Sequence, residues 1–357
     1  MKRRLLLVII IVIASIFLIP SVNAEQKISS DVYETDSENK SIFIDTENKT
    51  AVLKHINESD GIKLKKSWWI TSDIVAEVNT SDYDIQELSD NKNINYIDTD
   101  KLIDVPKGYN SSSNNEFYDA LETIRVNKTW ERYNSRGKGT RVTVIDTGVN
   151  DEHPAIELSS KDPWKDFVNT SNDEPKDPSF ITHGTIVSSQ ITGKNNSGKQ
   201  IGVAPESNLA VARVCSSGGC KTSNIISAIQ WSVETDSDVA QLSLGGVSYG
   251  YFVEPVQNAK ELGTIVVASI GNDGEGTSLT PAALPNTIGV GSTDVDKQVS
   301  EFSSGKLLDT EDVWGNDKLK SWNKNHMTPE LVAPGENVVV GVGSKSYVSR
   351  SGTSFAS

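Results

Sequence analysis

From about residue 116 to the end of the chain, short apolar runs alternate with segments of helical character. Several of these runs contain almost no polar residue, which is typical of parallel strands buried on both faces. Segments with helical spacing lie between them, at Asn224–Val233 and Val253–Leu262. The sequence therefore predicts an α/β fold in which helices flank a parallel β-sheet. The predicted strands are Val142–Ile145, Leu209–Val214, Val239–Leu244, Thr264–Ser269 and Thr287–Val290.

The preceding region, residues 25–113, has the pattern of a separate small module. Asp73–Val78 and Ile94–Asp98 alternate polar and apolar residues, as half-buried strands do, and Tyr83–Leu88 has helical spacing. This order predicts a compact α+β module. The polar stretch Asn110–Asn115 is typical of an exposed linker, where proteases cut most easily.

The first 24 residues have the pattern of an export signal. A basic start at Lys2–Arg4 precedes an uninterrupted apolar run, Leu5–Ile19, and Val22–Ala24 has small residues where a signal peptidase cleaves. An uncleaved anchor is the alternative, because Leu5–Ala24 could nearly span a bilayer. We expect cleavage after Ala24 and a secreted protein, extracellular or cell-wall associated, which meets the membrane only through its export signal.

Charge and cysteine content narrow the possible partners. The 357 residues carry a formal net charge of −14, which argues against nucleic acid, because phosphate contacts need clustered Lys and Arg. The two cysteines, Cys215 and Cys220, flank a turn-prone Ser-Ser-Gly-Gly sequence. Export permits a disulfide between them, and free thiols are the alternative. Two cysteines alone cannot complete a structural zinc site.

Three polar residues form a candidate catalytic set. Asp146 ends a predicted strand, His183 opens a helix-like segment, and Ser354 follows Gly-Thr near the end of the chain. Active residues of a parallel sheet lie at the carboxyl ends of its strands. A serine can act as nucleophile if a histidine takes its proton and a carboxylate orients that histidine. Taken singly, an aspartate at the end of a strand is more often a helix cap, a histidine is more often structural, and the serine of a Gly-Thr-Ser sequence more often lies in a loop.

The segments around these residues resemble those of the subtilisin-like serine proteases (peptidase S8). The resemblance covers residues 114–357 and implies a serine endopeptidase with the catalytic residues Asp146, His183 and Ser354. No metal or other cofactor is then required for the chemistry. The matching segments are Val144–Val149, His183–Thr185, Ile201–Pro205, Val332–Gly335 and Gly352–Ser354.

The same resemblance assigns further roles. Asn272, within Ser269–Gly274, would donate to the oxyanion together with the backbone N–H of Ser354. Asp273 and Glu275 lie beside it; if they line the specificity pocket, they favour a basic residue before the scissile bond, and otherwise they are solvated loop acids. The residues expected to pair with the substrate backbone are Ser243, Leu244, Gly245 and Gly246.

The N-terminal module resembles the propeptides of this family, which assist folding and then inhibit until they are cut. We therefore expect a zymogen with its own propeptide as intramolecular inhibitor and a self-cut in or near Asn110–Glu116. The substrate is a peptide or protein. Within the family the whole architecture looks most like the leader peptidases of lantibiotic clusters, which are exported and cut a modified precursor peptide.

Two departures from the family pattern bear on these expectations. Lys194–Gln200 resembles a calcium-binding loop, but Ala155 stands where an aspartate is expected, and Lys194 and Lys199 add positive charge. The sequence thus disfavours a structural calcium ion at this loop but leaves it as an alternative. In subtilisins a long buried helix begins at the Ser motif, whereas this sequence ends at Ser357, so we expect a C-terminally truncated catalytic domain. The alternative function is a catalytically inactive homologue or a secreted binding protein.

Overall fold

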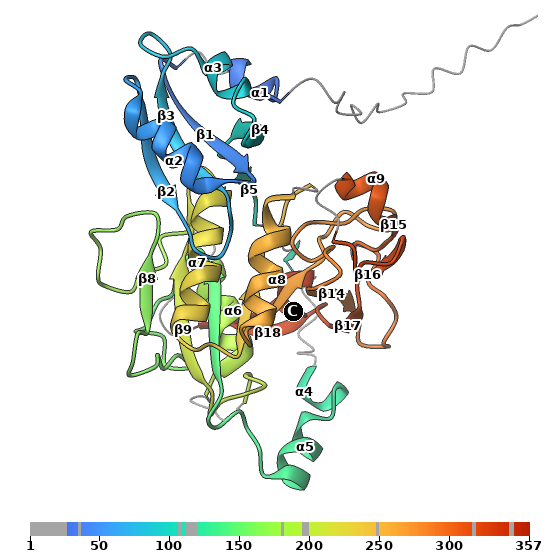
Figure 1. The fold of residues 1–357 in the computed structure, drawn as a ribbon. Coiled ribbons are helices and arrows are strands. Elements are labelled where there is room, and N and C mark those ends of the chain that lie inside the picture. The colour runs from blue at the N-terminus through green and yellow to red at the C-terminus, as the bar shows by residue number, and fades with distance from the viewer. Residues whose placement is uncertain are drawn as a thin grey trace, which may run out of the picture.

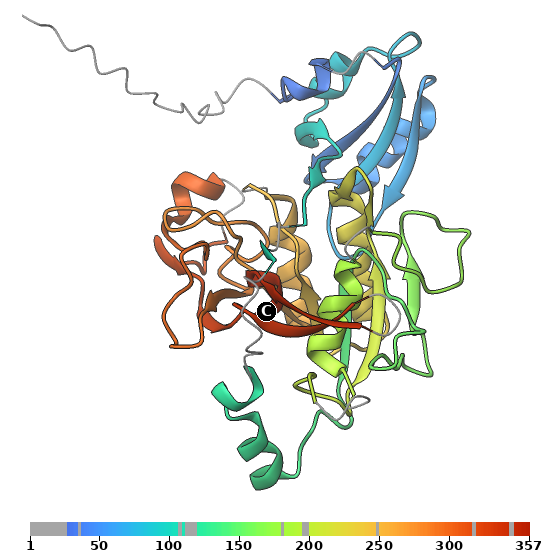
Figure 2. The ribbon, with the colours of Figure 1, turned by 180° about the vertical axis from the view of Figure 1, so that it is seen from behind.

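The structure is a computed structural model that places an N-terminal module on a larger α/β domain (Figure 1, Figure 2). The signal segment 1–24, most of the linker 110–115 and the centre of the calcium-like loop lie outside the described residues. None of the helices in the described part of the chain has the length and apolar character needed to cross a membrane. The described residues are 27–34, 37–105, 109–110, 120–179, 182–194, 200–247, 250–315, 319–342 and 346–357.

The N-terminal module is a four-stranded antiparallel sheet with helices on one side. Its strand order is β2-β3-β1-β4, and the chain runs β-α-β-β-α-β through β1, α2, β2, β3, α3 and β4. Apolar residues of both longer helices pack on the sheet, among them Val52, Ile56 and Leu88. The elements are α1 (Asp31–Glu34), β1 (Asn39–Thr46), α2 (Lys49–Glu58), β2 (Ile62–Ser67), β3 (Ile74–Asn79), α3 (Ile85–Ser89) and β4 (Ile94–Thr99).

The larger domain is built on a parallel sheet of seven strands in the order β17-β14-β13-β12-β7-β9-β8. All five predicted strands belong to it. Every residue of the interior strand β7 is buried, in keeping with the apolar residues Val142, Val144 and Ile145 within it. The strands are β7 (Arg141–Asp146), β8 (Trp164–Asp166), β9 (Asn208–Arg213), β12 (Val239–Leu242), β13 (Ile265–Ser269), β14 (Ile288–Thr293) and β17 (Leu331–Pro334).

Helices cover both faces of this sheet, which confirms the predicted fold class. The predicted helices between strands are α7 (Thr222–Glu234) and α8 (Val253–Glu261), and they lie side by side on one face (Figure 1). On the opposite face lie α6 (His183–Thr192) and the hairpin of β18 (Val338–Val342) and β19 (Ser346–Ser351) (Figure 2).

Short elements complete the chain around the sheet. The hairpin of β10 and β11 and the strands β5 and β6 border the candidate site described below. The last described element, η3, is a single 3₁₀ turn. These elements are β5 (Leu102–Ile103), β6 (Tyr109–Asn110), α4 (Ala120–Thr123), α5 (Val126–Tyr133), β10 (Cys215–Ser216), β11 (Gly219–Lys221), η1 (Gly250–Phe252), β15 (Lys306–Asp309), α9 (Thr310–Trp314), β16 (Asn325–Thr328) and η3 (Thr353–Phe355).

The module rests on α7 and α8, and the two bodies share one apolar core. Phe43 and Trp68 of the module are buried with apolar residues of both helices. The ring of Phe43 lies 4.4 Å from that of Tyr251, and the indole N–H of Trp68 donates to Ser227 Oγ over 2.8 Å. Burial of large aromatic side chains is the main source of stability in such a contact.

Polar groups fix the orientation of the module on the two helices. Asp100 accepts hydrogen bonds from the backbone N–H and the hydroxyl of Ser223, at 3.0 and 2.7 Å, and so caps the N-terminus of α7. On α8, one carboxylate oxygen of Glu254 accepts from Thr71 Oγ1 and from both the N–H and hydroxyl of Ser72. The Lys66 ammonium group donates to Asn224 Oδ1 over 2.6 Å.

Lys66 makes this docking pH-dependent. Burial lowers the pKa of its ammonium group to about 8; Asp100 opposes the shift and Lys221 adds to it. Since an exposed lysine has a pKa of about 10.4, the docked chain loses a proton between these values that the unfolded chain keeps. The free energy of unfolding therefore rises with pH in this window, by less than about 1.4 kcal/mol per pH unit. Below about pH 8 both states are charged, and docking bears the full cost of burying the charge.

Denaturant unfolding between pH 8 and 10 checks this, with Lys66→Met as the matched variant that keeps the stem and cannot titrate. Tyrosines whose pKa is raised by burial, such as Tyr251 and Tyr96, act equally in both chains. The stability difference between the two chains is thus due to Lys66. If both chains show the same pH trend, Lys66 is not its source.

Candidate active site

Asp146 and His183 form a buried carboxylate–imidazole pair. Asp146 is the last residue of β7 and is 0% exposed, while His183 is the first residue of α6 and is 1% exposed. The His183 Nδ1 atom lies 2.8 Å from Asp146 Oδ1 and 3.0 Å from Oδ2. Such a contact fixes the ring orientation and leaves Nε2 as the atom that can exchange a proton.

Two glycines let the backbone segments that carry this pair approach each other. Gly148 has φ of +129°, and a Cβ there would lie 2.0 Å from the carbonyl oxygen of Lys176. A Cβ at Gly184 would lie 2.1 Å from the carbonyl oxygen of Gly148. A larger residue at Gly184 would push the turn after β7 away from the N-terminus of α6, and one at Gly148 would push that turn away from the segment that leads into α6.

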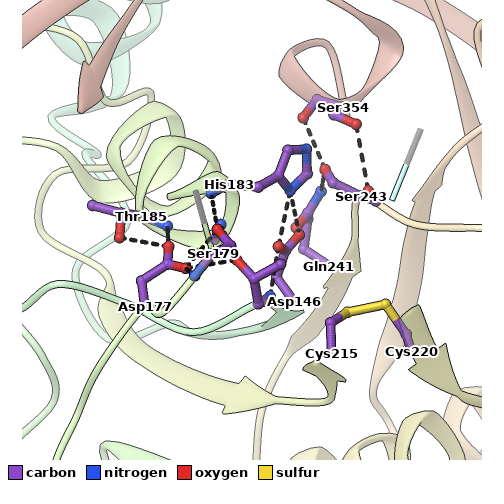
Figure 3. A network of polar contacts seen from close by, with 12 residues as sticks. Asp146, Asp177, Ser179, His183, Thr185, Cys215, Cys220, Gln241, Ser243 and Ser354 are labelled. Carbon is purple, nitrogen blue, oxygen red and sulfur yellow. Dashed lines mark hydrogen bonds and ion pairs between the residues drawn. A yellow bond between two sulfur atoms is a disulfide. The ribbon is translucent and has the colours of Figure 1, made fainter. Parts of the chain in front are cut away.

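Ser354 lies at the same site, in the 3₁₀ turn η3, and is buried. Its Oγ is 3.4 Å from the carbonyl oxygen of Ser243, and Ser243 Oγ donates to the carbonyl of Ser354 over 2.8 Å. The ring of the next residue, Phe355, lies 6.0 Å from the imidazole ring of His183. Among the described residues, His183 Nε2 is buried with no hydrogen-bond partner. Figure 3 shows the imidazole between Asp146 and Ser354.

Asn272 has its side-chain amide oriented by the residue before the serine. Its Oδ1 accepts from both the backbone N–H and the hydroxyl of Thr353, each at 2.9 Å. With the oxygen held in this way, the amide nitrogen lies on the side of Gly352, 3.4 Å from where a Cβ of that glycine would stand. A donor fixed beside the Ser354 turn is the arrangement that an oxyanion site needs.

The four residues expected to pair with substrate backbone lie beyond the end of β12, which is two residues shorter than predicted. Gly246 exchanges backbone hydrogen bonds with Thr280, at 3.0 and 2.8 Å. Gly245 forms an antiparallel bridge with Asp104, to whose carbonyl its N–H donates over 3.3 Å. A peptide strand therefore does lie along this segment, and it is the chain's own.

That strand continues onto a hairpin closed by a disulfide. β5 pairs antiparallel with β11, which pairs with β10, and a disulfide joins Cys215 to Cys220. Ile103 of β5 is 1% exposed and packs in the same core cluster as both cysteines. Further along the chain, β6 pairs with the last residues of β19, directly before Gly352. Two stretches of the segment that follows the module thus pair with strands bordering the site.

Two other predictions from the sequence, the acidic specificity pocket and the calcium-binding loop, have less support in the structure. Asp273 and Glu275 are exposed on the loop after Asn272, so the acidic-pocket idea stays a prediction. Within the described part of the chain, no group of three or more His, Cys, Asp or Glu side chains could hold a metal ion. Of the calcium-like loop, the two end residues Lys194 and Gln200 are described, and Lys194 forms an ion pair with Glu157.

Asp177, which lies in the segment leading into α6, was not predicted from the sequence as part of the site. Its carboxylate accepts hydrogen bonds from the side chains of Thr147, Ser179 and Thr185 (Figure 3). The Asp-Pro-Ser sequence before the helix is a turn signal that could have drawn attention to it. The partners on the β7 side could not have been found in this way, because they are some thirty residues away along the chain.

Comparison with known proteins agrees with this arrangement of sheet and site. The sequence model of the Subtilase family matches residues 137–357. The major intracellular serine protease of Bacillus subtilis (strain 168) is 31% identical over 274 residues, covering 74% of this chain and 76% of that protein. Subtilisin Savinase of Lederbergia lenta is 33% identical over 223 residues, covering 62% of this chain and 72% of that protein.

The chain therefore belongs to the subtilase family and is a serine-type endopeptidase by class. Its fold is also similar to the crystal structure of the epidermin leader peptide processing serine protease (EpiP) from Staphylococcus aureus. That likeness has a TM-score of 0.64 at 19% sequence identity and covers 90% of this chain and 85% of the other.

The orientation of Asn272 leads to a prediction for catalysis. Replacing Asn272 with Ala removes the amide donor, and we expect kcat to fall by about 10²–10³ with little change in KM, a magnitude that comes from a subtilisin donor of this kind and not from this site. Steady-state hydrolysis of a chromogenic peptide measures both constants. Thr353→Val, which removes the hydroxyl bound to Asn272 Oδ1 and keeps the donor, is the control and should lose far less activity. A kcat unchanged in Asn272→Ala would contradict the oxyanion role.

Proposed function

We propose that this protein is an exported serine endopeptidase in which Asp146, His183 and Ser354 form the catalytic triad. One observation carries the proposal. The buried imidazole of His183 is held by Asp146 at 2.8 Å, and its Nε2 has no partner among the described residues, in the site that also contains Ser354. A buried nitrogen without a partner costs stability, and an Nε2 left free in this way is the acceptor that general-base catalysis requires.

The reaction follows from these positions. Ser354 Oγ attacks the carbonyl carbon of the peptide bond, and His183 Nε2 takes the hydroxyl proton. Asp146 stabilises the imidazolium at Nδ1, and the Asn272 amide and the Ser354 backbone N–H stabilise the oxyanion. The imidazolium then protonates the leaving amine, and water releases the acyl group by the same steps. Rotation of the Ser354 hydroxyl from Ser243 toward Nε2 precedes attack.

The N-terminal module acts in this proposal as an intramolecular inhibitor of a zymogen. Two observations support this: the backbone of Asp104 bridges Gly245, and Ile103 is buried beside the disulfide hairpin. In both, the chain's own backbone lies along the edge where we expect an extended substrate to pair. β6, which pairs with β19 directly before Gly352, brings the start of the Asn110–Glu116 stretch close to the Ser354 turn. We therefore keep the self-cut in or near Asn110–Glu116.

The substrate we propose is the leader segment of a lantibiotic precursor peptide. The support is the resemblance noted from the sequence together with the similarity in fold to the epidermin leader peptide processing serine protease. Export rests on this chain's own residues 1–24, since two relatives are named as intracellular proteases. The alternative function is that of a catalytically inactive homologue or a secreted binding protein, which would have the same fold but would not hydrolyse peptides.

Self-processing distinguishes the enzyme from the inactive homologue. The secreted wild-type chain should convert to a shorter form that begins in or near Asn110–Glu116, and Ser354→Ala should stay uncut, because it has no nucleophile. N-terminal sequencing and intact mass of both chains give the readout, and a leader-containing precursor peptide is the added substrate. If both chains behave alike, Ser354 is not the nucleophile. A processed wild-type chain that ignores the precursor and cuts casein would reject only the substrate class.

Inhibition by the module depends on Ile103. Replacing it with Asp places a charge in an apolar site, so the cut module should leave sooner and shorten the delay between self-cut and activity on added peptide. Gel analysis of the cut and a fluorogenic peptide assay, run on the same sample, measure this delay. Leu102→Asp is the matched control, because Leu102 is the adjacent strand residue and is 56% exposed. Equal delays in the two variants would argue against docking through Ile103.

A further inference from the structure

We propose that Asp177 is the positioning residue that holds Asp146 and His183 in their relative places, an inference that rests on the proposed function of that pair. Asp177 touches neither reacting atom. It lies between the turn that follows Asp146 and the helix that begins with His183, and it binds both (Figure 3). Its effect on catalysis is therefore exerted through backbone placement.

The carboxylate of Asp177 accepts five hydrogen bonds from neutral donors. Oδ1 accepts from Thr147 Oγ1 at 2.9 Å, from Ser179 Oγ at 2.9 Å and from the Ser179 N–H at 3.3 Å. Oδ2 accepts from the N–H and the hydroxyl of Thr185, at 2.9 and 2.8 Å. Hydrogen bonds to a charged acceptor are shorter and stronger than neutral ones. Five of them leave this group little freedom to move.

These bonds organise the N-terminus of α6, whose first amides have no partner within the helix. The N-cap residue Thr182 makes no side-chain cap. Instead, the N–H of His183 donates to Ser179 Oγ at 3.1 Å, that of Gly184 to Thr147 Oγ1 at 2.9 Å, and that of Thr185 to Asp177 itself. Both hydroxyls that act as caps donate in turn to Asp177. One carboxylate thus supports three caps, and its charge suits the positive end of the helix dipole.

The same carboxylate reaches the strand side through Thr147. This residue follows Asp146, and its N–H donates to Asp146 Oδ1 over 2.7 Å. Its hydroxyl donates to Asp177 and accepts from Gly184. The N–H of Asn150, in the same turn, donates to Thr185 Oγ1. Without Asp177, the Thr147 hydroxyl loses the acceptor that orients its proton, and the link between the turn and the helix is reduced to the bonds from the Gly184 and Asn150 amides.

The first experiment needs no turnover. In the uncut Ser354→Ala chain, the Nδ1–H proton of His183 bonded to Asp146 should give a strongly deshielded ¹H NMR signal, assigned by its loss in His183→Gln. Adding Asp177→Ala should shift or broaden that signal, and Asp177→Asn, which can accept on one side only, should do so less. Asp173→Ala, an exposed acid of the same segment, is the control and should leave it in place. An unchanged signal in Asp177→Ala overturns the proposal.

The second experiment uses the active chain. Asp177→Ala should lower kcat by about 10- to 100-fold with KM within about twofold, because small misplacements of catalytic groups have effects of this size. The kcat/KM pH profile should also move on its acid side, which a general loss of folded protein would not cause. A wild-type profile in Asp177→Ala contradicts the proposal.

Thr147 provides a second test if Asp177→Ala does not fold. Thr147→Val keeps the shape and removes the bridging hydroxyl, so it should lower kcat in the same way, while Thr147→Ser keeps the hydroxyl and should restore it. Equal kcat in the Val and Ser variants would contradict the proposal. If the wild-type chain itself shows no hydrolysis, the proposed function fails, and the NMR result alone decides the role of Asp177.

Discussion

The close approach of two backbone turns is the constraint on which the rest of the site depends. The turn after β7 and the N-terminus of α6 meet at Gly148 and Gly184, where a Cβ would stand about 2 Å from a carbonyl oxygen. Only at this separation do the carboxylate of Asp146 and the imidazole of His183 come into hydrogen-bond contact. Asp177 then ties the same two segments together by side-chain bonds. The lack of side chains at the two glycines allows the approach, and the hydrogen bonds of Asp177 fix its geometry.

The N-terminal module and the site are connected by one apolar core. It runs from Phe43 and Trp68, under the docked module, to Ile103 and the disulfide-linked cysteines at the border of the site. The backbone edges of β11 and Gly245 offer unpaired hydrogen-bonding groups to any extended peptide. In this structure the chain's own segment satisfies them. Under the proposed function, a substrate and this segment would compete for the same edges, which would give inhibition by the module a physical basis.

The accuracy of the sequence predictions varied with the burial of each element. Five of the seven strands of the parallel sheet (β7, β9, β12, β13 and β14) were predicted near their observed positions, because strands covered on both faces are rich in apolar residues. The two edge strands β8 and β17 were not predicted. In the module, β3, α3 and β4 were predicted, whereas β1, α2 and β2 were not. β2 has the sequence Ile-Lys-Leu-Lys-Lys-Ser and is largely exposed, so its pattern resembles a loop. β12 ends two residues earlier than predicted. Beyond it, Gly245 and Gly246 form isolated bridges with Asp104 and Thr280, which are distant in the sequence.

By itself, the sequence determined the fold class, the residue types available for chemistry and their order along the chain. These follow from local patterns of apolar spacing and from short motifs. The tertiary structure decided which groups meet: Asp177 with Thr147, Asp104 with Gly245, Lys66 with Asn224, and Cys215 with Cys220, for which the sequence left free thiols open. Apart from the cysteines, these contacts join residues far apart in the chain. Their formation depends on how the strands, helices and module pack, and no local pattern encodes that packing.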